Sequence, residues 1–357
     1  MSERTDFTVG RKDWSDSRIE SHPAGELGPG QIRLMIERFA LTSNNISYAA
    51  AGEMLKYWEF FPASEGRGRI PAMGFGDVVE SRHEAVSEGT RVFGFFPMST
   101  ELVVDAEGTG DRFVDAVSHR SEHAPAYRGY DNVASDPMYS ADSENQIILF
   151  RGLFMTSFLV DDFVADNDHF GSERLLISSA SSKTSIALAH CAKARGHSRV
   201  VGFTSAGNRE FTEKLGCYDD VLLYDDIESI DTSTPSVFVD MAGNAGVVSR
   251  LHGHLGNTLK HNCVVGATHW DQGGRPPELP GPNPEFFFAP GQMVKRSKDW
   301  GPGGLQERMG ESWSNFRNFS DEWLTVVHGR GAAVLDRVYQ DTLAGKIDPS
   351  VGNVISL

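Results

Sequence analysis

The stretch SSASSKTS, from Ser178 to Ser185, carries five serines, a threonine and a lysine. It follows the apolar run RLLI and precedes IALAHCAKARG, where apolar residues recur near helical spacing and Gly196 can cap the carboxyl end. Hydroxyl and ammonium groups at the start of a helix are donors for phosphate oxygens, because a helix N-terminus leaves backbone N–H groups unpaired. The stretch is a candidate phosphate site in a strand-to-helix turn.

The turn contains none of the chain's 37 glycines. A dinucleotide-binding turn of the form G-x-G-x-x-G, ending at the helix start, would place its glycines at Ala180, Ser182 and Ser185. Alanine and serine are the smallest replacements and keep part of the close approach. In an equally weighted alternative, the site has lost its ligand and the serines only cap the helix. A G-x-x-x-x-G-K-[ST] loop is disfavoured because both of its glycines are absent. The candidate phosphate-binding residues are Ser179, Ala180, Ser182, Lys183 and Thr184.

The end of the next predicted strand, RVVGFTS, bears on the choice of cofactor. An acidic residue there would bind a ribose 2′-hydroxyl and repel a 2′-phosphate. This strand instead ends in Thr204 and Ser205, and Arg209 follows. Neutral donors and a cation favour NADP (NADPH) over NAD, although Arg209 could also be an ordinary solvated residue in the first turn of a helix.

Strands and helices must place these groups at one edge of a sheet. From residue 174 to 270, apolar strand candidates alternate with helical segments, a pattern that predicts a parallel, doubly wound sheet. Residues 31–105 have short apolar stretches divided by Gly and Pro and predict a β-rich domain. Residues 108–145 are polar with little periodicity and predict a long connection or lid.

The order of these parts resembles a known superfamily. The segments LTSNNISY, GTRVFGFFP, VVGFTSAGNREFTEKLGCYDDVLLYDD, VFVDMAGN and LAGKIDPSVGNVISL are similar to those of zinc-independent medium-chain dehydrogenases/reductases, in the quinone oxidoreductase and enoyl reductase branch. Finer details, such as YWEFFP, FMTSFLVDDF and GATHWD, resemble an uncharacterised subgroup without an assigned activity.

The resemblance implies an α/β fold with a GroES-like β-rich catalytic domain and a doubly wound Rossmann-type nucleotide-binding domain. The expected boundaries are 1–145 for the first part of the catalytic domain, 146–275 for the nucleotide-binding domain, and 276–357 for a segment that returns to the catalytic domain. It also implies a homodimer formed through the nucleotide-binding sheets. GFGDVVE stands where a zinc enzyme would have G-H-E, so no metal is expected.

Three side chains are the candidates for chemistry on a carbonyl substrate. Asn44 matches the branch's asparagine near the nicotinamide, and Tyr48 could donate a proton or hydrogen bond to an enolate. His269 follows a predicted strand, where a crevice over the sheet binds ligands. The alternatives are a turn-forming asparagine, a tyrosine packed in the core and a loop histidine paired with a carboxylate.

Four further positions are assigned to the cofactor. Gly243 and Asn244 end the fourth strand, where the resemblance implies backbone contacts with the cofactor. Tyr224 is a candidate for the adenosine side, and Thr268 lies in the loop after the fifth strand.

Composition excludes several other classes of function. A net charge of −16 argues against nucleic-acid binding, which relies on clustered Lys and Arg. No apolar run is long enough for a membrane helix, and the amino terminus lacks the apolar core of a signal peptide, so we expect a cytoplasmic protein. Its three cysteines show no paired spacing.

The sequence therefore predicts an NADPH-dependent, metal-independent reductase that transfers hydride to a small enone, quinone or ketone. The alternative is a non-redox member of the same fold with a degenerate dinucleotide site. Such a protein would sense a nucleotide or use the cleft for carbonyl chemistry such as carbon–carbon bond hydrolysis. The loss of all three glycines is the main support for this alternative.

Overall fold

The computed structural model describes residues 3–265 and 279–357. The chain forms two compact units, one made of residues 1–149 with 324–357 and the other of residues 150–323. The helix α3 (Glu144–Asp166) crosses from the first to the second in sequence. The first unit is therefore discontinuous in the chain, and the second is a single insertion within it.

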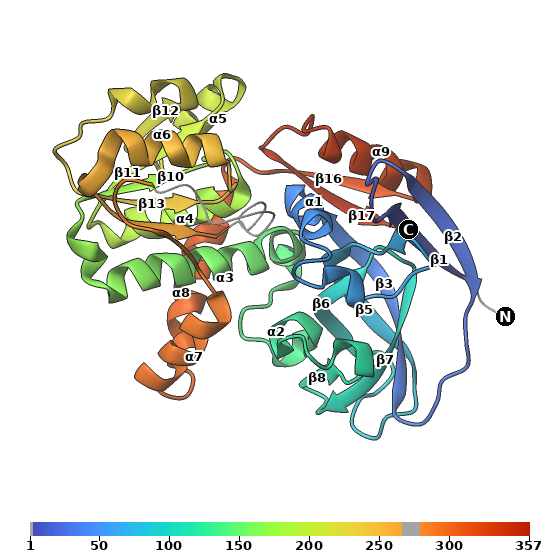
Figure 1. Ribbon diagram of the computed structural model, residues 1–357. Helices are drawn as coiled ribbons and strands as arrows, with labels where there is room; N and C mark the ends of the chain where they lie inside the picture. The colour runs from blue at the N-terminus through green and yellow to red at the C-terminus, as the bar shows by residue number, and fades with distance from the viewer. Residues whose placement is uncertain (1–2, 266–278) are drawn as a thin grey trace. The chain divides into compact units, whose positions relative to one another are not determined.

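The first unit is built on an eight-stranded sheet whose order is β16-β17-β3-β5-β6-β9-β8-β7, with an additional β3–β7 pairing. Because β3 pairs with both β5 and β7, the strands from β3 to β7 close into a barrel, shown in blue and teal in Figure 1. The strands are β3 (Gln31–Leu41), β5 (Pro71–Ser81), β6 (Arg91–Pro97), β7 (Glu101–Gly108), β8 (Arg112–Asp115), β9 (Gly129–Asn132), β16 (Thr325–Arg330) and β17 (Val351–Ser356).

Residues 108–145 do not form the long connection or lid that their polar composition predicted. They contribute β8, β9 and the short helix α2 (Pro125–Arg128) to this unit. The prediction failed because these strands are four residues long, too short to show a hydrophobic period.

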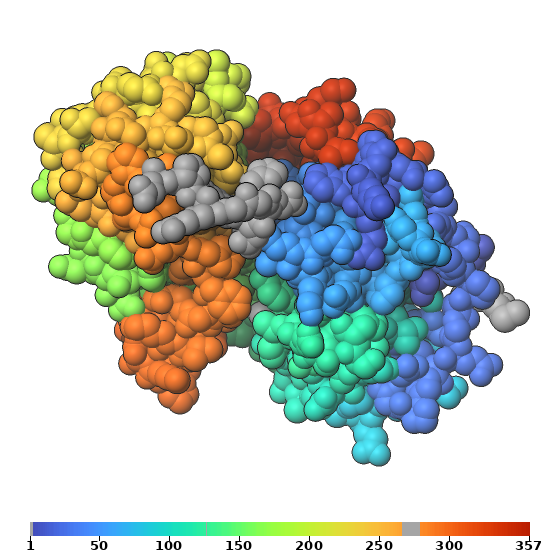
Figure 2. All heavy atoms as spheres, viewed as in Figure 1, coloured from blue at the N-terminus to red at the C-terminus, as the bar shows by residue number. Residues whose placement is uncertain are grey.

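A second, small sheet is made of strands from the amino-terminal part of the chain. It has the order β2-β1-β4, made of β1 (Glu3–Gly10), β2 (Ser17–Pro23) and β4 (Arg67–Gly68). The helix α9 (Ala332–Leu343) packs against it, and its Tyr339 hydroxyl donates to the Trp14 carbonyl at 2.8 Å. Figure 2 shows these carboxy-terminal residues, in red, beside the amino-terminal residues in blue.

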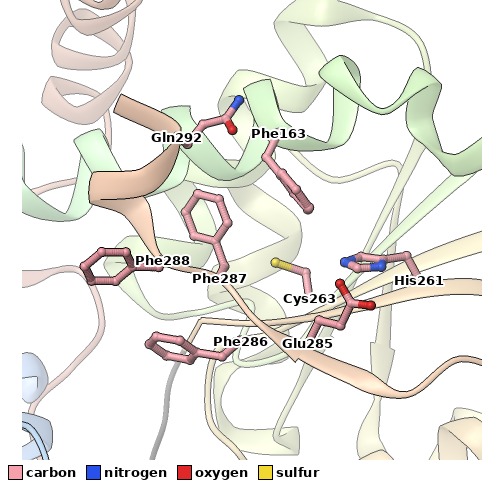
Figure 3. A pocket seen from close by; sticks show the side chains of 8 residues that line it. All are labelled: Phe163, His261, Cys263, Glu285, Phe286, Phe287, Phe288 and Gln292. Carbon is pink, nitrogen blue, oxygen red and sulfur yellow. The ribbon is translucent and has the colours of Figure 1, made fainter. Parts of the chain in front are cut away.

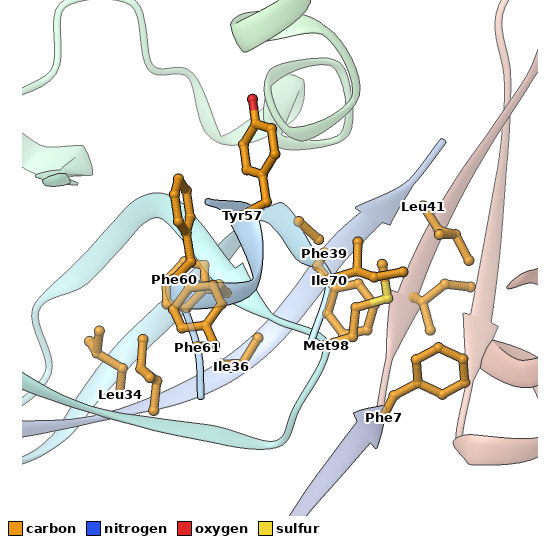
Figure 4. Close-up of a cluster of buried hydrophobic side chains, with 14 of the residues drawn as sticks. Phe7, Leu34, Ile36, Phe39, Leu41, Tyr57, Phe60, Phe61, Ile70 and Met98 are labelled. Atoms are coloured by element: carbon orange, nitrogen blue, oxygen red, sulfur yellow. The ribbon is translucent and has the colours of Figure 1, made fainter. Parts of the chain in front are cut away.

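The core of the first unit is aliphatic and aromatic. Phe7, Phe39, Leu41 and Ile70 are each at most 1% exposed. Figure 4 shows them between the strands, with Tyr57 at the margin of the cluster and its hydroxyl directed away from it. The Tyr57 hydroxyl is therefore a polar group at the edge of an otherwise apolar core.

The second unit is a six-stranded sheet with the order β12-β11-β10-β13-β14-β15, and all its strand pairs are parallel. The order reverses direction between β10 and β13, so the crevice at their carboxyl ends is the expected ligand site of such a sheet. The strands are β10 (Arg174–Ile177), β11 (Arg199–Thr204), β12 (Asp220–Leu223), β13 (Ser236–Asp240), β14 (Leu259–Val264) and β15 (Pro284–Phe286).

Helices cover both faces of this sheet, and Figure 1 shows α6 on one face and α3 on the other. Leu176 and Phe238 of the strands form a buried cluster with Leu251 of α6. The helices are α4 (Lys183–Arg195), α5 (Arg209–Lys214), α6 (Ala245–Leu255), α7 (Ala289–Asp299) and α8 (Gly304–Asp321). Both α7 and α8 lie in the second unit, and only residues 324–357 of the expected returning segment join the first unit.

No helix in the described part of the chain is long and apolar enough to cross a membrane.

The helix α1 (Ser43–Ala50) also belongs to the first unit.

Candidate functional site

The glycine-free turn between β10 and α4 is held by its own hydroxyl groups. The Ser182 side chain caps α4 by accepting from the Ser185 N–H at 3.2 Å. The Ser185 hydroxyl in turn donates to the Ser178 carbonyl at 2.8 Å. Ser182 therefore does have the capping role of the alternative interpretation, and Gly196 ends the helix at a φ of 71° as predicted.

The chain keeps the tight turn without glycine by two adjustments. Ser179 adopts a φ of 51°, a left-handed conformation that a side chain rarely takes. Ala180 packs over Gly202 of β11, where a Cβ added to the glycine would lie 2.7 Å from the Cβ of Ala180. The room for close helix-to-strand packing is thus provided by the neighbouring strand.

Tyr224 lies at the apex of the turn. Its hydroxyl accepts a hydrogen bond from the Ser179 N–H at 2.8 Å, and its ring stacks on Phe203 with 6.4 Å between centroids. Because this N–H is already paired, it is not a donor for a phosphate unless Tyr224 moves. The hydroxyl protons of Ser178, Ser182 and Ser185 are also used, in hydrogen bonds to Asp240, Ser185 and the Ser178 carbonyl. The first turn of α4 is the part of this segment whose backbone can approach a phosphate.

The end of β11 has no acidic side chain in the segment from Thr204 to Arg209. The Asn208 amide donates to the Ser181 hydroxyl at 3.0 Å, which joins this loop to the serine turn. Arg209 pairs with Glu213 at 2.8 Å, and both side chains are 48% exposed. Such an exposed pair is weak, so the guanidinium can turn to another anion at little cost.

Asp240 is the last residue of β13 and lies at the carboxyl end of that strand. One carboxylate oxygen accepts from the Ser178 hydroxyl at 2.9 Å and from the Ala242 and Gly243 N–H groups at 3.1 Å each. The other oxygen is buried and has no partner among the described residues. Burial raises the pKa of this carboxyl group, although the hydrogen bonds oppose the shift.

Gly243 and Asn244 lie beside Asp240, where the sequence placed them. Gly243 has a φ of 66° and so uses the conformational freedom of glycine. The Asn244 side chain caps α6 by accepting from the Gly246 and Val247 N–H groups. Its amide oxygen is therefore occupied, and the backbone of this turn is the part that can contact a cofactor.

In the first unit, Asn44 and Tyr48 lie one turn apart on α1. Asn45 is the buried asparagine: its side chain accepts from the Thr42 N–H at 2.7 Å and donates to the Pro71 carbonyl at 2.9 Å. Asn44 is left half-exposed beside Tyr48, and its hydrogen bonding favours the phenolate. Burial outweighs this effect and raises the pKa of Tyr48 to about 12, so its hydroxyl keeps its proton at neutral pH.

Two further tyrosines, which the sequence analysis did not single out, lie next to Tyr48. The Tyr57 ring is 4.8 Å from that of Tyr48 and 6.3 Å from that of Tyr127. Burial raises the pKa of Tyr57 and of Tyr127, and a hydrogen bond links their hydroxyls. The motif YWEFFP gave only aromatic composition as a signal, because the partner Tyr127 is 70 residues away in sequence.

Thr268 and His269 lie outside the described residues. Within the described residues, no group of three or more His, Cys, Asp or Glu side chains could hold a metal ion. The other predicted cofactor residues follow the carboxyl ends of neighbouring parallel strands or form those ends: Ser179, Ala180, Ser182, Lys183, Thr184, Thr204, Ser205, Arg209, Tyr224, Gly243 and Asn244.

The donor set of this crevice fits a phosphorylated dinucleotide. Serine hydroxyls and the N-terminus of α4 stand at the first turn, the β11 end lacks an acid, and Gly202 leaves room for the turn to approach the sheet. The Tyr224 hydroxyl on the Ser179 N–H is the feature that fits least, because it removes one backbone donor.

Solved structures with the same fold span the full chain. An alcohol dehydrogenase from Pyrobaculum aerophilum is 12% identical with a TM-score of 0.58, and a quinone oxidoreductase from Coxiella burnetii is 12% identical with a TM-score of 0.54. An enoyl thioester reductase from Candida tropicalis, in a mutant form, is 12% identical with a TM-score of 0.53. Each comparison covers 100% of both chains. No protein with a curated description matches the sequence.

The chain thus has the fold of the medium-chain dehydrogenases/reductases, and the expected α/β class with GroES-like and Rossmann-type domains is confirmed. Residues 39–348 match the model of a family described as a protein of unknown function, DUF2855. The chain belongs to that family, which agrees with the resemblance to an uncharacterised subgroup.

Proposed function

We propose that this protein is an NADPH-dependent, metal-independent reductase of a small enone, quinone or ketone. The observation that carries the proposal is the serine turn after β10, which is joined to a β11 end without an acidic residue at the switch point of the strand order. The shared fold with a quinone oxidoreductase and an enoyl thioester reductase supports the reaction class.

NADPH, when bound, supplies the hydride. We propose the following roles for the chain's own residues. The Ser182 turn and Lys183 bind the pyrophosphate, and Ser205 with Arg209 binds the 2′-phosphate. Asn44 orients the nicotinamide, and Tyr48 gives its hydroxyl proton or a hydrogen bond to the substrate oxygen as negative charge develops there. His269 is a second candidate for proton transfer, and Thr268 for a cofactor contact.

Tyr48 suits this role because its hydroxyl stays protonated at neutral pH. Its pKa of about 12 results mainly from burial, and Tyr57 packs against its ring at 4.8 Å. A neutral phenol beside apolar rings is a hydrogen-bond donor in a site of low dielectric constant, where it stabilises an oxyanion more than it would in water.

A second candidate function is a non-redox protein of the same fold. It is favoured by the Tyr224 hydroxyl, which takes the Ser179 N–H that a dinucleotide turn would offer to the cofactor. In that case the crevice would bind another ligand, or bind a nucleotide without hydride transfer.

Titration of the full chain with NADPH and NADH decides between these two functions. Binding is followed by quenching of the six tryptophans and by the shift in melting temperature. Saturable and selective binding of NADPH supports the reductase and justifies a screen of enones and quinones for NADPH oxidation. Absence of binding by either nucleotide would overturn the reductase and favour the non-redox function.

We further propose a homodimer formed through the nucleotide-binding sheets. The strand β15 is the outermost of its sheet in the described chain, and its Phe286 is 54% exposed. Phe288, just beyond the strand, is 58% exposed. Large exposed aromatic side chains beside an open strand edge are typical of a surface that a partner covers.

A further inference from the structure

A hollow of about 220 Å³ lies in the second unit, beside β14 and β15 and under α3 and α7. Figure 3 shows Phe163, Phe287, His261 and Cys263 around it, with the Glu285 carboxylate directed toward His261. Phe286 and Phe288, which also belong to the proposed dimer surface, line it as well. In the order of the sheet, β14 and β15 are separated from β10 by β13. The hollow is therefore distinct from the serine turn.

The two helices beside the hollow are joined by side-chain contacts. The α7 helix is tied to α3 by Arg296, which pairs with Asp162 at 2.7 Å and Asp166 at 3.0 Å. Gln292 also donates to Asp162, at 2.6 Å. A hollow between two helices held by buried ion pairs keeps its shape without a ligand, which lowers the cost of binding one.

His261 and the buried Gln292 are polar groups on the inner wall of this hollow. The His261 ring is 5% exposed and stacks on Phe170, with the ring centroids 4.1 Å apart and the planes at 1°. Its Nε2 is buried without a hydrogen-bond partner among the described residues. Burial lowers the pKa of His261, so the ring is neutral and one of its nitrogens is an acceptor.

The turn that holds this ring is strained. Asp168, His169 and Phe170 have φ values of 50°, 48° and 53°, all left-handed. Three consecutive left-handed residues cost free energy and persist only where the surrounding packing requires them. Here they place Phe170 flat on one face of His261, so that Nδ1, which is not buried as Nε2 is, is the ring nitrogen open to a ligand.

The remaining groups define the charge of that ligand. Glu285 is exposed, and its carboxylate is close enough to raise the pKa of both His261 and Cys263. Burial also raises the pKa of Cys263, so its thiol is neutral and acts as an apolar wall. A carboxylate and a neutral imidazole accept hydrogen bonds from a cation and disfavour an anion.

We propose that this hollow binds a small primary amine with one aromatic ring, its ammonium group donating to Glu285 and His261 and its ring against Phe163 and Phe287. The ring faces of these phenylalanines also attract a cation that lies over them. The volume suits one ring, since a cavity of about 150 Å³ holds benzene.

The test is isothermal titration calorimetry of the full chain with 2-phenylethylamine. Two probes of similar shape serve as controls, 2-phenylethanol without the charge and 3-phenylpropanoate with the opposite charge. We expect saturable binding of the amine, with a dissociation constant of about 1 mM or tighter for a ligand of this size. The alcohol should bind about tenfold more weakly or worse, and the carboxylate should not bind.

Two variants assign the binding to this hollow. Glu285→Gln keeps the shape of an exposed side chain and should weaken amine binding about tenfold. His261→Phe keeps the stacking on Phe170, removes the acceptor and should also weaken binding. Glu210→Gln, on the exposed face of α5, is the matched control and should leave the affinity unchanged.

Several results would overturn the proposal: no heat of binding with the amine up to about 10 mM, equal binding of amine and alcohol, or unchanged affinity in Glu285→Gln. The amine should bind equally well whether or not NADPH binds, because the two sites lie on different strands. Failure of the reductase proposal would thus leave this one standing, and the reverse also holds.

Discussion

At the scale of single residues, Ser179 bears the conformational cost of a turn without glycine. Its φ of 51° is left-handed, a conformation that costs a non-glycine residue about 1–2 kcal/mol. Ser179→Gly removes this cost, while glycine gives back part of it through the entropy of the unfolded chain. We expect the free energy of unfolding to rise by up to about 1 kcal/mol in chemical denaturation.

The neighbouring Ser182→Ala is the matched control for that experiment. It removes the side chain that caps α4 and should lower the free energy of unfolding by about 1 kcal/mol. If Ser179→Gly destabilises the protein as Ser182→Ala does, the strain at Ser179 is not the dominant effect and its side chain supports the fold.

The tyrosine cluster gives a second prediction at this scale. Tyr48→Phe keeps the ring packing and removes the hydroxyl, so it should lower kcat by about a hundredfold with an active enone or quinone substrate. Steady-state kinetics measures this, with NADPH affinity as the check that the cofactor site is intact. Tyr127→Phe should reduce kcat less, because Tyr127 acts through its hydrogen bond to Tyr57.

The result with Tyr57→Phe shows whether Tyr48 or Tyr57 donates the proton to the substrate. If this variant loses turnover and Tyr48→Phe keeps it, Tyr57 is the proton donor and the prediction for Tyr48 is wrong. All three substitutions preserve the rings, so a general loss of folding is excluded by equal melting temperatures.

The sequence could indicate which residue types belong to the site. It could not indicate which of two neighbouring residues of one type has its side chain engaged in hydrogen bonds within the fold. In NNISY, Asn45 is occupied by the Thr42 N–H and the Pro71 carbonyl, which leaves Asn44 for function. That choice depends on β5, which begins at Pro71, 26 residues after Asn45. Tyr57 was missed for the same reason, since a cluster of hydroxyls formed by distant segments has no local pattern.

At the scale of the elements, the neighbouring strand explains why the turn after β10 needs no glycine. The turn packs against β11, and Gly202 on β11 gives the room that a glycine in the turn would otherwise provide. Sequence analysis placed the β10 turn and the α4 helix correctly because the buried strand, the serine cap and Gly196 are local signals. It could not see that the space came from the next strand.

The end of β11 carries the prediction on cofactor choice. Replacing Ser205 with Asp and Arg209 with Glu places negative charge where a 2′-phosphate would bind. NADPH affinity should fall at least about tenfold, and NADH affinity should change little. Fluorescence titration with both nucleotides measures the ratio.

Lys214→Glu, on the same helix as Arg209, is the control for a general effect of charge. It removes an exposed lysine that pairs with Glu210 and should leave the NADPH to NADH ratio unchanged. Equal losses for both nucleotides in the Ser205 and Arg209 variant would contradict a role in recognising the 2′-phosphate.

Asp240, where β13 ends, makes stability depend on pH. Burial raises the pKa of its carboxyl group above the unfolded value, so the native state binds the proton more tightly. The contribution of Asp240 to stability is therefore greatest when it is protonated and falls as pH rises through its folded pKa. Asp240→Asn keeps one acceptor oxygen for the same donors and removes the buried charge.

The measurement is the free energy of unfolding of both proteins by chemical denaturation at pH values from below the unfolded pKa of 3.8 up to about pH 8. We expect the variant to gain stability relative to the wild type as pH rises through the folded pKa of Asp240. A wild type that loses no stability relative to Asp240→Asn over this range would show that the carboxylate is compensated in the native state.

At the scale of the whole molecule, the sequence predicted the folds of the two units better than it predicted which unit each segment joins. Alternating strands and helices are a strong signal for the parallel sheet, whereas the barrel strands β8 and β9 are too short to show a period. The helix α8 lies in the second unit because its apolar face packs there, as with Phe316 on Phe150 and Phe154. The helix α7 is held there by the ion pair between Arg296 and Asp162. That preference depends on tertiary contacts which the local pattern does not contain.

The last prediction concerns the proposed homodimer. The wild type should sediment with twice the 39.1 kDa mass of one chain. Phe286→Ser with Phe288→Ser removes two exposed aromatic side chains from the edge of the sheet and should shift the protein toward the monomer, because aromatic residues contribute strongly to interfaces. Met54→Ser, an exposed apolar residue of the first unit, should leave the mass unchanged. A monomeric wild type would contradict the homodimer, and a double variant that stays dimeric would place the association elsewhere.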